Sequence, residues 1–184
     1  YNALFSNYTG SYNLAIGNSA LYANSYGTYN VAIGTYSLYS NTSSYNVAVG
    51  AYALFQNTYA YNTAVGHQAL YSNTTANENS AVGYRALYSN TTGSYNTSIG
   101  SQSLTSNTTG YENTSVGYAS LLVNTTGYYN VAVGVGSLRS TSSGSENVGV
   151  GYQTLFLNTN GYQNVAIGAN ALRLNVTGGE NIAV

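Results

Sequence analysis

The side chains that could perform acid–base chemistry are few and widely spaced. The only histidine is His67, the acidic residues are all glutamates, and the chain has no Asp or Cys. Acid–base and nucleophilic catalysis need groups within hydrogen-bond reach of one another. The glutamates instead recur 34 residues apart, at Glu78, Glu112, Glu146 and Glu180. We therefore expect no enzyme, no catalytic or metal-binding residue and no cofactor.

A second set of residues could carry a modification. The acceptor pattern for N-glycosylation, Asn-x-Ser/Thr, recurs at one turn of a repeat. The same letters are also favourable turn chemistry, so the pattern has a purely structural interpretation too. If glycosylating enzymes meet the chain, the candidate sites are Asn7, Asn41, Asn73, Asn90, Asn107, Asn124 and Asn175.

Tyrosine supplies the third candidate chemistry, with 22 copies in 184 residues. Exposed rows of aromatic rings can stack on sugars or on partner chains. The alternative interpretation is that tyrosines stack on one another and stiffen the molecule. A further row of tyrosines begins with Tyr12 and Tyr29. The possible surface aromatic row is Tyr22, Tyr39, Tyr71 and Tyr88.

These residues are positioned by a repeat that opens with Asn, three small or β-branched residues and Gly. Asn130-Val-Ala-Val-Gly134 is one copy, and eleven openings can be counted from Asn13 to Asn181. The spacing is 17 residues in eight intervals and 16 in two. A short fixed period is the signature of a solenoid. We number each unit from its Asn, so that Gly is position 5.

Alternation within positions 2 to 4 predicts a short strand. Positions 2 and 4 are aliphatic or mostly β-branched, and we expect them to face the core. Position 3 is always Ala, Ser or Gly, which predicts close approach of a second layer or chain on the opposite face. The same assignment predicts that Val82→Asp collapses the fold. Position 8 is nearly always small, and position 9 is always Leu.

The Leu at position 9 predicts a second short strand with its side chain inward, followed by an Asn-rich turn. The fold class is therefore all-β, a parallel β-solenoid of about eleven 17-residue coils with two short strands per coil. Residues 1–184 form a single repeat array that we expect to be an excerpt of a longer fibre. The expected core ladder is Leu21, Leu38, Leu54, Leu70, Leu87, Leu104, Leu121, Leu138, Leu155 and Leu172.

Stacked coils place each residue on its equivalent one coil away, so asparagines at positions 1 and 12 are expected to form hydrogen-bonded rows. A thin coil buries little by itself. We therefore expect self-association into a homo-oligomer, a trimer or a filament, with the small residues of position 3 at the interface. A monomeric solenoid is the alternative.

Charge and hydropathy argue against two classes of partner, nucleic acid and the membrane interior. Only 4% of residues are charged and the formal net charge is −1. No basic field is present to attract nucleic acid. The longest apolar runs are a few residues, too short to span a membrane within this segment.

The opening pentad, followed by two residues and then Ala or Ser, resembles the head repeat of trimeric autotransporter adhesins. It reads Asn-Val-Ala-Ile-Gly-Ala-Asn-Ala over 164–171 and Asn-Val-Ala-Ile-Gly-Thr-Tyr-Ser over 30–37. The longer form, with Leu and Asn-Thr-Thr-Gly, is similar to repeats of phage tail-fibre-like proteins. This resemblance implies a left-handed parallel β-roll that is homotrimeric and surface-exposed. The unit here is longer than the family's.

The expected function is that of an extracellular structural fibre or stalk that self-associates through its stacked coils. The alternative is a trimeric adhesin or phage tail-fibre shaft that binds surface glycans. A third hypothesis is ice binding through rows of threonine in the turns. All three place the chain outside the cell or on a cell or virion surface.

Overall fold

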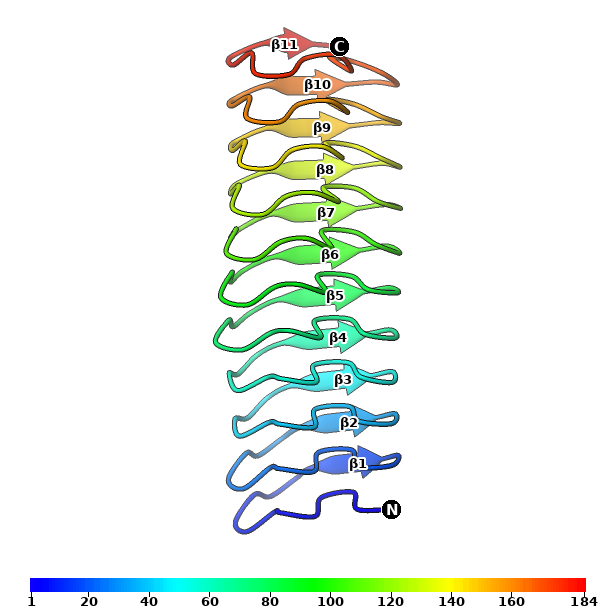
Figure 1. The fold of residues 1–184 in the computed structure, drawn as a ribbon, viewed down its shortest axis with the longest axis vertical. Coiled ribbons are helices and arrows are strands. Elements are labelled where there is room, and N and C mark those ends of the chain that lie inside the picture. Colours follow the sequence, from blue (N-terminus) through cyan, green and yellow to red (C-terminus); the bar gives the residue numbers. More distant parts are fainter.

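The computed structural model describes residues 1–184, which form a straight rod of stacked coils (Figure 1). Each coil contributes one short strand to a single parallel sheet, and the strands follow one another in chain order and in register. The fold is therefore an all-β parallel solenoid without helices. The strands are β1 (Leu14–Ile16), β2 (Val31–Ile33), β3 (Val47–Val49), β4 (Thr63–Val65), β5 (Ser80–Val82), β6 (Thr97–Ile99), β7 (Thr114–Val116), β8 (Val131–Val133), β9 (Val148–Val150), β10 (Val165–Ile167) and β11 (Ile182–Ala183).

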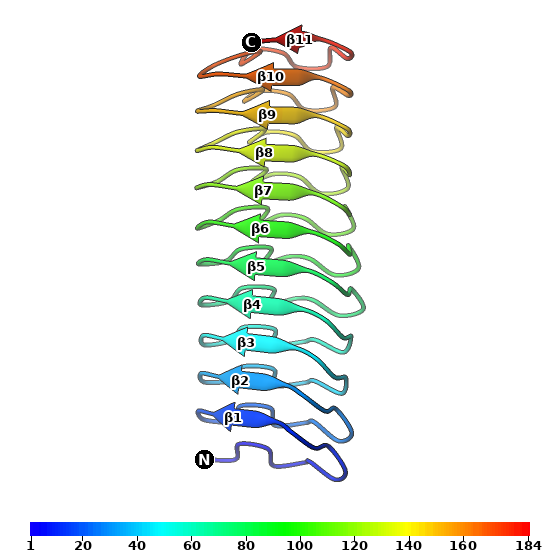
Figure 2. The same cartoon turned by 180° about the vertical axis from the view of Figure 1, so that it is seen from behind.

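The coil is flattened, with the strands on one side and an irregular return segment on the other. In Figure 1 the return segments pass in front and run leftward, while the strands lie behind and run rightward as the chain rises. Figure 2 shows the same path from the strand side. The chain therefore climbs as a left-handed coil, the hand that the resemblance implies.

The return segment contains no second strand, so that part of the sequence prediction is wrong. The reason is backbone conformation at positions 7 and 9, which is left-handed along the rod. The Leu at position 9 has φ between 46° and 55° in all eleven copies. An extended strand needs negative φ, so these residues form successive turns. The turns still bond coil to coil, as in Leu38 N to Ala53 O at 3.0 Å. Only 20 of 114 backbone hydrogen bonds join one strand to another, and many of the others join the turns of neighbouring coils.

Left-handed φ also accounts for the residue types at these positions. β-branched side chains are genuine outliers at positive φ, whereas unbranched ones are tolerated. None of the non-Gly residues with positive φ is Val, Ile or Thr. Leu at position 9 therefore supplies apolar volume in a conformation that Ile or Val would resist.

The core lies between the strand and the return segment. Nine of the ten predicted ladder leucines, Leu21 to Leu155, are fully buried, and Leu172 in the last coil is half-buried. The predicted strand faces are reversed, however. The small residue at position 3 points into the coil, and Ala81 is 0% exposed. The aliphatic residue at position 4 points out, and Val82 is 40% exposed.

The size limit at position 3 therefore reflects a thin interior and not a neighbouring chain. Position 3 faces positions 8 and 9 of the return segment, and in one coil the volumes of positions 3 and 8 compensate. Where position 8 enlarges to Thr154, position 3 shrinks to Gly149, and a Cβ there would lie 3.0 Å from Thr154 Oγ1 and 2.7 Å from Ser137 Oγ. A larger residue at this position would require the hydroxyl groups of Ser137 and Thr154 to move.

The corner after each strand requires glycine. Gly83 has φ of +137°, a region almost restricted to Gly. A Cβ at Gly83 would also lie 2.5 Å from the carbonyl oxygen of Gly100 in the next coil. Position 5 is therefore Gly both for its conformation and for the close stacking of corners.

Two rows of buried asparagine run the length of the rod, as predicted. At position 12 the side-chain amide donates to the Oδ1 of the Asn one coil before, with Asn90 Nδ2 to Asn73 Oδ1 at 2.9 Å, and the row is broken only at Thr141. The same amide donates to a backbone oxygen of its own turn, with Asn90 Nδ2 to Gly93 O at 2.8 Å. At position 1, Oδ1 accepts the backbone N–H of the next Asn, with Asn96 N to Asn79 Oδ1 at 2.9 Å. The two rows adjoin at the same turn, where Asn62 Nδ2 lies 3.2 Å from Asn57 Oδ1, and their buried amides fix the stacking register.

Candidate functional surfaces

The strands present an apolar surface to solvent, which we call the outer sheet face. It consists of the side chains at positions 2 and 4 of β1 to β11. Position 4 is Val or Ile on every strand from β1 to β10 and is substantially exposed on six of them. The exposed fraction is 36% for Val65 and 43% for Ile99. Isolated exposed aliphatics are ordinary, but a continuous row on adjacent strands is a patch.

The outer sheet face carries no charged residue on any strand. Position 2 is aliphatic at both ends of the rod and changes to hydroxyl residues on β4 to β7, where it reads Thr63, Ser80, Thr97 and Thr114. Strands repeat every ~4.8 Å and span ~3.3 Å per residue. Ten strands of three residues and one of two therefore present on the order of 500 Å², at the upper end of what monomeric proteins leave exposed.

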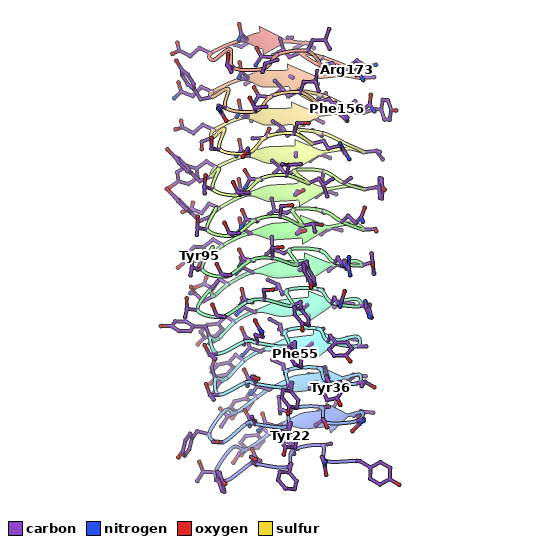
Figure 3. All side chains as sticks on the ribbon, viewed as in Figure 1. Tyr22, Tyr36, Phe55, Tyr95, Phe156 and Arg173 are labelled. Carbon is purple, nitrogen blue, oxygen red and sulfur yellow. The ribbon has the colours of Figure 1, made fainter.

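Aromatic rings stack along the return segments at position 10. Phe5, Tyr22, Tyr39, Phe55, Tyr71 and Tyr88 form one unbroken column, with ring centroids 5.0 to 5.2 Å apart. All four tyrosines predicted as a surface row belong to this column and are half-buried. Figure 3 shows Tyr22 and Phe55 on the same side of the rod. Stacking of ring on ring is thus present, and the outer ring edges remain accessible.

The position-10 column continues toward the C-terminus with cations. Arg139 and Arg173 place their guanidinium groups 5.6 and 5.3 Å from the ring of Phe156, one from each neighbouring coil. A guanidinium is planar and stacks on rings. The column therefore keeps planar groups in contact even where the residue type changes. Figure 3 shows Phe156 and Arg173 at the same edge.

The opposite edge of the rod, just before each strand, carries position 17. It holds Tyr12, Tyr29, Tyr45 and Tyr61 in the first four coils, stacked with centroids 4.8, 5.3 and 5.2 Å apart. We call these four residues the corner Tyr row. Beyond it, glutamates alternate with Tyr95, Tyr129 and Gln163.

Alternation keeps the negative charges two coils apart, about 10 Å, which is close to one Debye length at physiological salt. Shallow notches open beside Glu78 and Glu112, lined by Tyr61 and Tyr95 respectively. The Glu112 carboxylate raises the pKa of Tyr129 above its ordinary value, because a nearby negative charge disfavours the phenolate. Gln163 donates to Glu146 at 2.9 Å. The charges therefore interact with neutral neighbours and not with one another.

The predicted glycosylation sites lie in the interior. Asn41, Asn73, Asn90, Asn107 and Asn124 are 0% exposed and belong to the position-12 hydrogen-bond row. Asn7 and Asn175 in the end coils are half-buried and make the same bonds to their own turns. Attachment of a glycan would require each Asn side chain to leave the row, so this placement conflicts with modification of the folded rod. The residue types of the sequons also suit the turn, and glycosylation stays a prediction.

The threonines of the turns are also engaged within the rod. Thr74, Thr91 and Thr108 donate their hydroxyls to backbone oxygens of the following coil, at 3.0 Å each. Only the next residue of each pair, such as Thr92, projects freely. The turns therefore offer a single Thr row and not the two-dimensional array on which an ice-binding surface depends.

The His and Glu side chains do not gather anywhere on the rod. His67 is exposed and stacks on Tyr84 with ring centroids 5.8 Å apart. No cluster of three or more His, Cys, Asp or Glu side chains is arranged to hold a metal ion. The structure contains no helix with the length and apolar character that a membrane span needs.

The fold and its surfaces define a β-solenoid repeat protein with stacked Asn and Leu ladders. Comparisons with protein-family models, with curated proteins and with solved structures find no match.

The outer sheet face is the feature that sequence reasoning missed, although signals for it were present. Positions 3 and 8 change together in several coils, from Ala81 with Ala86 to Ser98 with Ser103 and then Gly149 with Thr154, although two coils pair Ala with Ser. Ser98 Oγ donates to Ser103 O at 2.9 Å inside the coil. Linked changes at two small positions indicate that they touch, which would have placed position 3 inward and positions 2 and 4 outward.

Proposed function

We propose that the chain is a structural rod of an extracellular or virion-surface fibre and that copies of it associate side by side through the outer sheet face. The observation that carries this proposal is the outer sheet face itself, an uncharged and largely aliphatic strip along all eleven strands. The regular ladders of Leu and Asn support the role of a stiff spacer, because each coil repeats the contacts of the one before.

A second copy of the same chain suits this strip better than an unrelated partner. The strip has no charge with which to select a charged partner, and its rows have the strand spacing of any copy. β-Branched rows on flat parallel strands can interdigitate as dry interfaces. Two strips of about 500 Å² would bury on the order of 1,000 Å² in total, the lower range of specific interfaces. Three copies, the number implied by the resemblance, would bury more.

The test compares charges added to two sides of the same coils. In one variant, Val65→Lys and Ile99→Lys add charge to the outer sheet face, two coils apart. In the matched control, Thr75→Lys and Thr109→Lys add the same charge to the exposed turn tips of those coils. We expect parent and control to associate, and the face variant to associate more weakly by at least about 100-fold, since each unpaired buried charge costs about 3–5 kcal/mol.

Sedimentation velocity over a concentration series measures the association, and circular dichroism checks that all three proteins keep the parent fold. Equal association of the face variant and the parent would refute the proposed interface. Loss of association in the turn-tip control would move the interface to the turns.

A glycan-binding shaft is the second candidate function, favoured by the accessible ring edges of the position-10 column. Aromatic rings stack on the apolar faces of sugars. Replacing Tyr71 and Tyr88 by Ser should then abolish saturable binding on a glycan array while association is kept. Unchanged array binding would exclude this column as the site.

A further inference from the structure

The corner Tyr row combines three properties that favour one chemical modification. Its rings are stacked nearly parallel, with interplanar angles of 11°, 5° and 2°. Its members are exposed, from 47% for Tyr45 to 76% for Tyr12. The solenoid holds each phenol one coil from the next, so the neighbours meet without any motion of the backbone.

Phenols held in this way can approach closely enough to react. The torsion that turns a tyrosine ring about its Cβ–Cγ bond is broad, and exposed rings turn rapidly. The two Cε carbons of each ring, next to the hydroxyl-bearing carbon, are the positions at which phenoxyl radicals couple. Rotation of two stacked rings brings Cε of one toward Cε of the other.

The rest of the chain does not compete for oxidants. Cysteine, methionine and tryptophan are the side chains that oxidants ordinarily consume alongside tyrosine, and the chain contains none of them. A one-electron oxidant therefore removes electrons from the tyrosines of this protein. The corner Tyr row is a stack of four exposed tyrosines.

We propose that the corner Tyr row is a site of oxidative cross-linking, in which phenols of consecutive coils are joined by a carbon–carbon bond. The oxidant is a peroxide acting through a one-electron peroxidase. Two phenols each lose the hydrogen atom of their hydroxyl group, and the peroxide is reduced to two waters. The two phenoxyl radicals form one Cε–Cε bond, and the hydrogen on each bonded Cε moves to the phenol oxygen. The product has two hydrogen atoms fewer than the parent.

The position-17 edge contains its own control. Tyr95 occupies the same position as the corner Tyr row and is 51% exposed, but its neighbours along the edge are Glu78 and Glu112. Figure 3 shows Tyr95 on the edge where the strands begin. It has the exposure and the backbone conformation of Tyr45, with φ of 62° against 61°, and lacks only a stacked phenol. It should therefore oxidise without forming a link within the chain.

The position-10 column gives a second contrast. Phe5 and Phe55 interrupt it, and its tyrosines are half-buried. It therefore holds only the separate pairs Tyr22–Tyr39 and Tyr71–Tyr88, which we expect to link less than the corner Tyr row.

Links along the corner Tyr row would join neighbouring coils covalently and resist fraying of the rod. This inference needs only the folded coil and does not depend on side-by-side association.

The experiment treats dilute protein with hydrogen peroxide and a haem peroxidase and maps the linked peptides by mass spectrometry. In the parent we expect links within one chain at Tyr12–Tyr29, Tyr29–Tyr45 and Tyr45–Tyr61. Tyr45→Phe keeps the ring and its stacking but removes the hydroxyl hydrogen. It should abolish two of these three links.

Tyr95→Phe is the matched control, and it should leave the yield of all three links unchanged. Melting followed by circular dichroism before oxidation verifies that both variants keep the parent fold. Links distributed among exposed tyrosines without preference for stacked pairs would overturn the proposal. Links found only between chains at high dilution would overturn it as well.

Discussion

The inner and outer faces of the sheet lie one residue apart along the chain and follow different rules. Inside, position 3 never exceeds Ser in size, and Ala32, Ala64 and Ala132 are completely buried. Outside, positions 2 and 4 range from Ser to Leu and remain partly exposed. The side with the more hydrophobic residues is the side that faces solvent.

The difference shows that volume, and not hydrophobicity, marks the interior of a coil this thin. Leu from the return segment fills the space that a larger domain would share between two layers. The strand can then contribute only Ala, Ser or Gly. The aliphatic residues left outside are available for another copy, which is the basis of the proposed assembly.

The largest expected effect comes from moving one charge between the two faces. Ala81→Asp places an unpaired carboxylate in the interior, which costs about 3–5 kcal/mol or forces the rod to open. Val82→Asp, one residue later, places it in solvent and should leave the melting temperature of the monomer nearly unchanged. Thermal melts followed by circular dichroism measure both. Equal destabilisation by the two substitutions would mean that the faces are not distinct.

A smaller effect is expected where shape changes and polarity does not. Leu87→Ile keeps the volume of a buried residue but puts a β-branched side chain at φ of 55°. Positive φ is a genuine outlier for β-branched residues, so we expect a loss of stability larger than that from repacking alone, which is less than about 1.5 kcal/mol. Leu87→Met, which is unbranched at Cβ, should show the repacking cost only. Denaturant unfolding compares the two, and equal losses would remove backbone conformation as the reason for Leu.

The contrast between the two faces also shows which features the sequence could predict. The 17-residue period, the strand at positions 2 to 4, the buried Leu at position 9 and the Asn rows all follow from residues repeating in register. Identical side chains at a short fixed period predict a ladder, because stacked coils place each one on its equivalent. The hand of the coil came from the resemblance and agrees with the structure.

The orientation of the strand and the shape of the return segment could not be predicted in the same way. Three residues are too few for alternation to indicate which side is buried, so the more hydrophobic side was assigned to the core. The left-handed φ of Leu87 could be inferred from the sequence only through the absence of β-branched residues at position 9. The sequons were predicted as candidate sites because turn chemistry and acceptor chemistry use the same letters.

Buried polar groups need hydrogen-bond partners, and this requirement can be tested at the one break in the position-12 Asn row. Bonds of 2.7 to 3.1 Å link this row without interruption from Asn7 to Asn124. Thr141 stands next in the row, and both Asn124 Oδ1 and Thr141 Oγ1 are buried without a partner. Thr141→Asn would supply the missing donor and should stabilise the rod by about 1 kcal/mol. Melting of this variant against Thr141→Val, which adds no donor, separates the hydrogen bond from packing.

On the solvent-exposed corner, a charge should change only the pKa of its immediate neighbour. This is the smallest effect that we expect. Glu112 raises the pKa of Tyr129 from its ordinary value of 10.0, mainly by direct repulsion of the phenolate and with additions from burial and from Tyr111. Glu112→Gln removes the charge and keeps the shape. The pKa of Tyr129 should then fall back toward 10.0, and the phenolate should form at lower pH. Difference absorbance during an alkaline titration, with Tyr129→Phe to assign the signal, measures the shift. The melting temperature at neutral pH should not change, because both side chains lie in solvent at the corner. A loss of stability comparable to that of Ala81→Asp would show that the corner is part of the buried core.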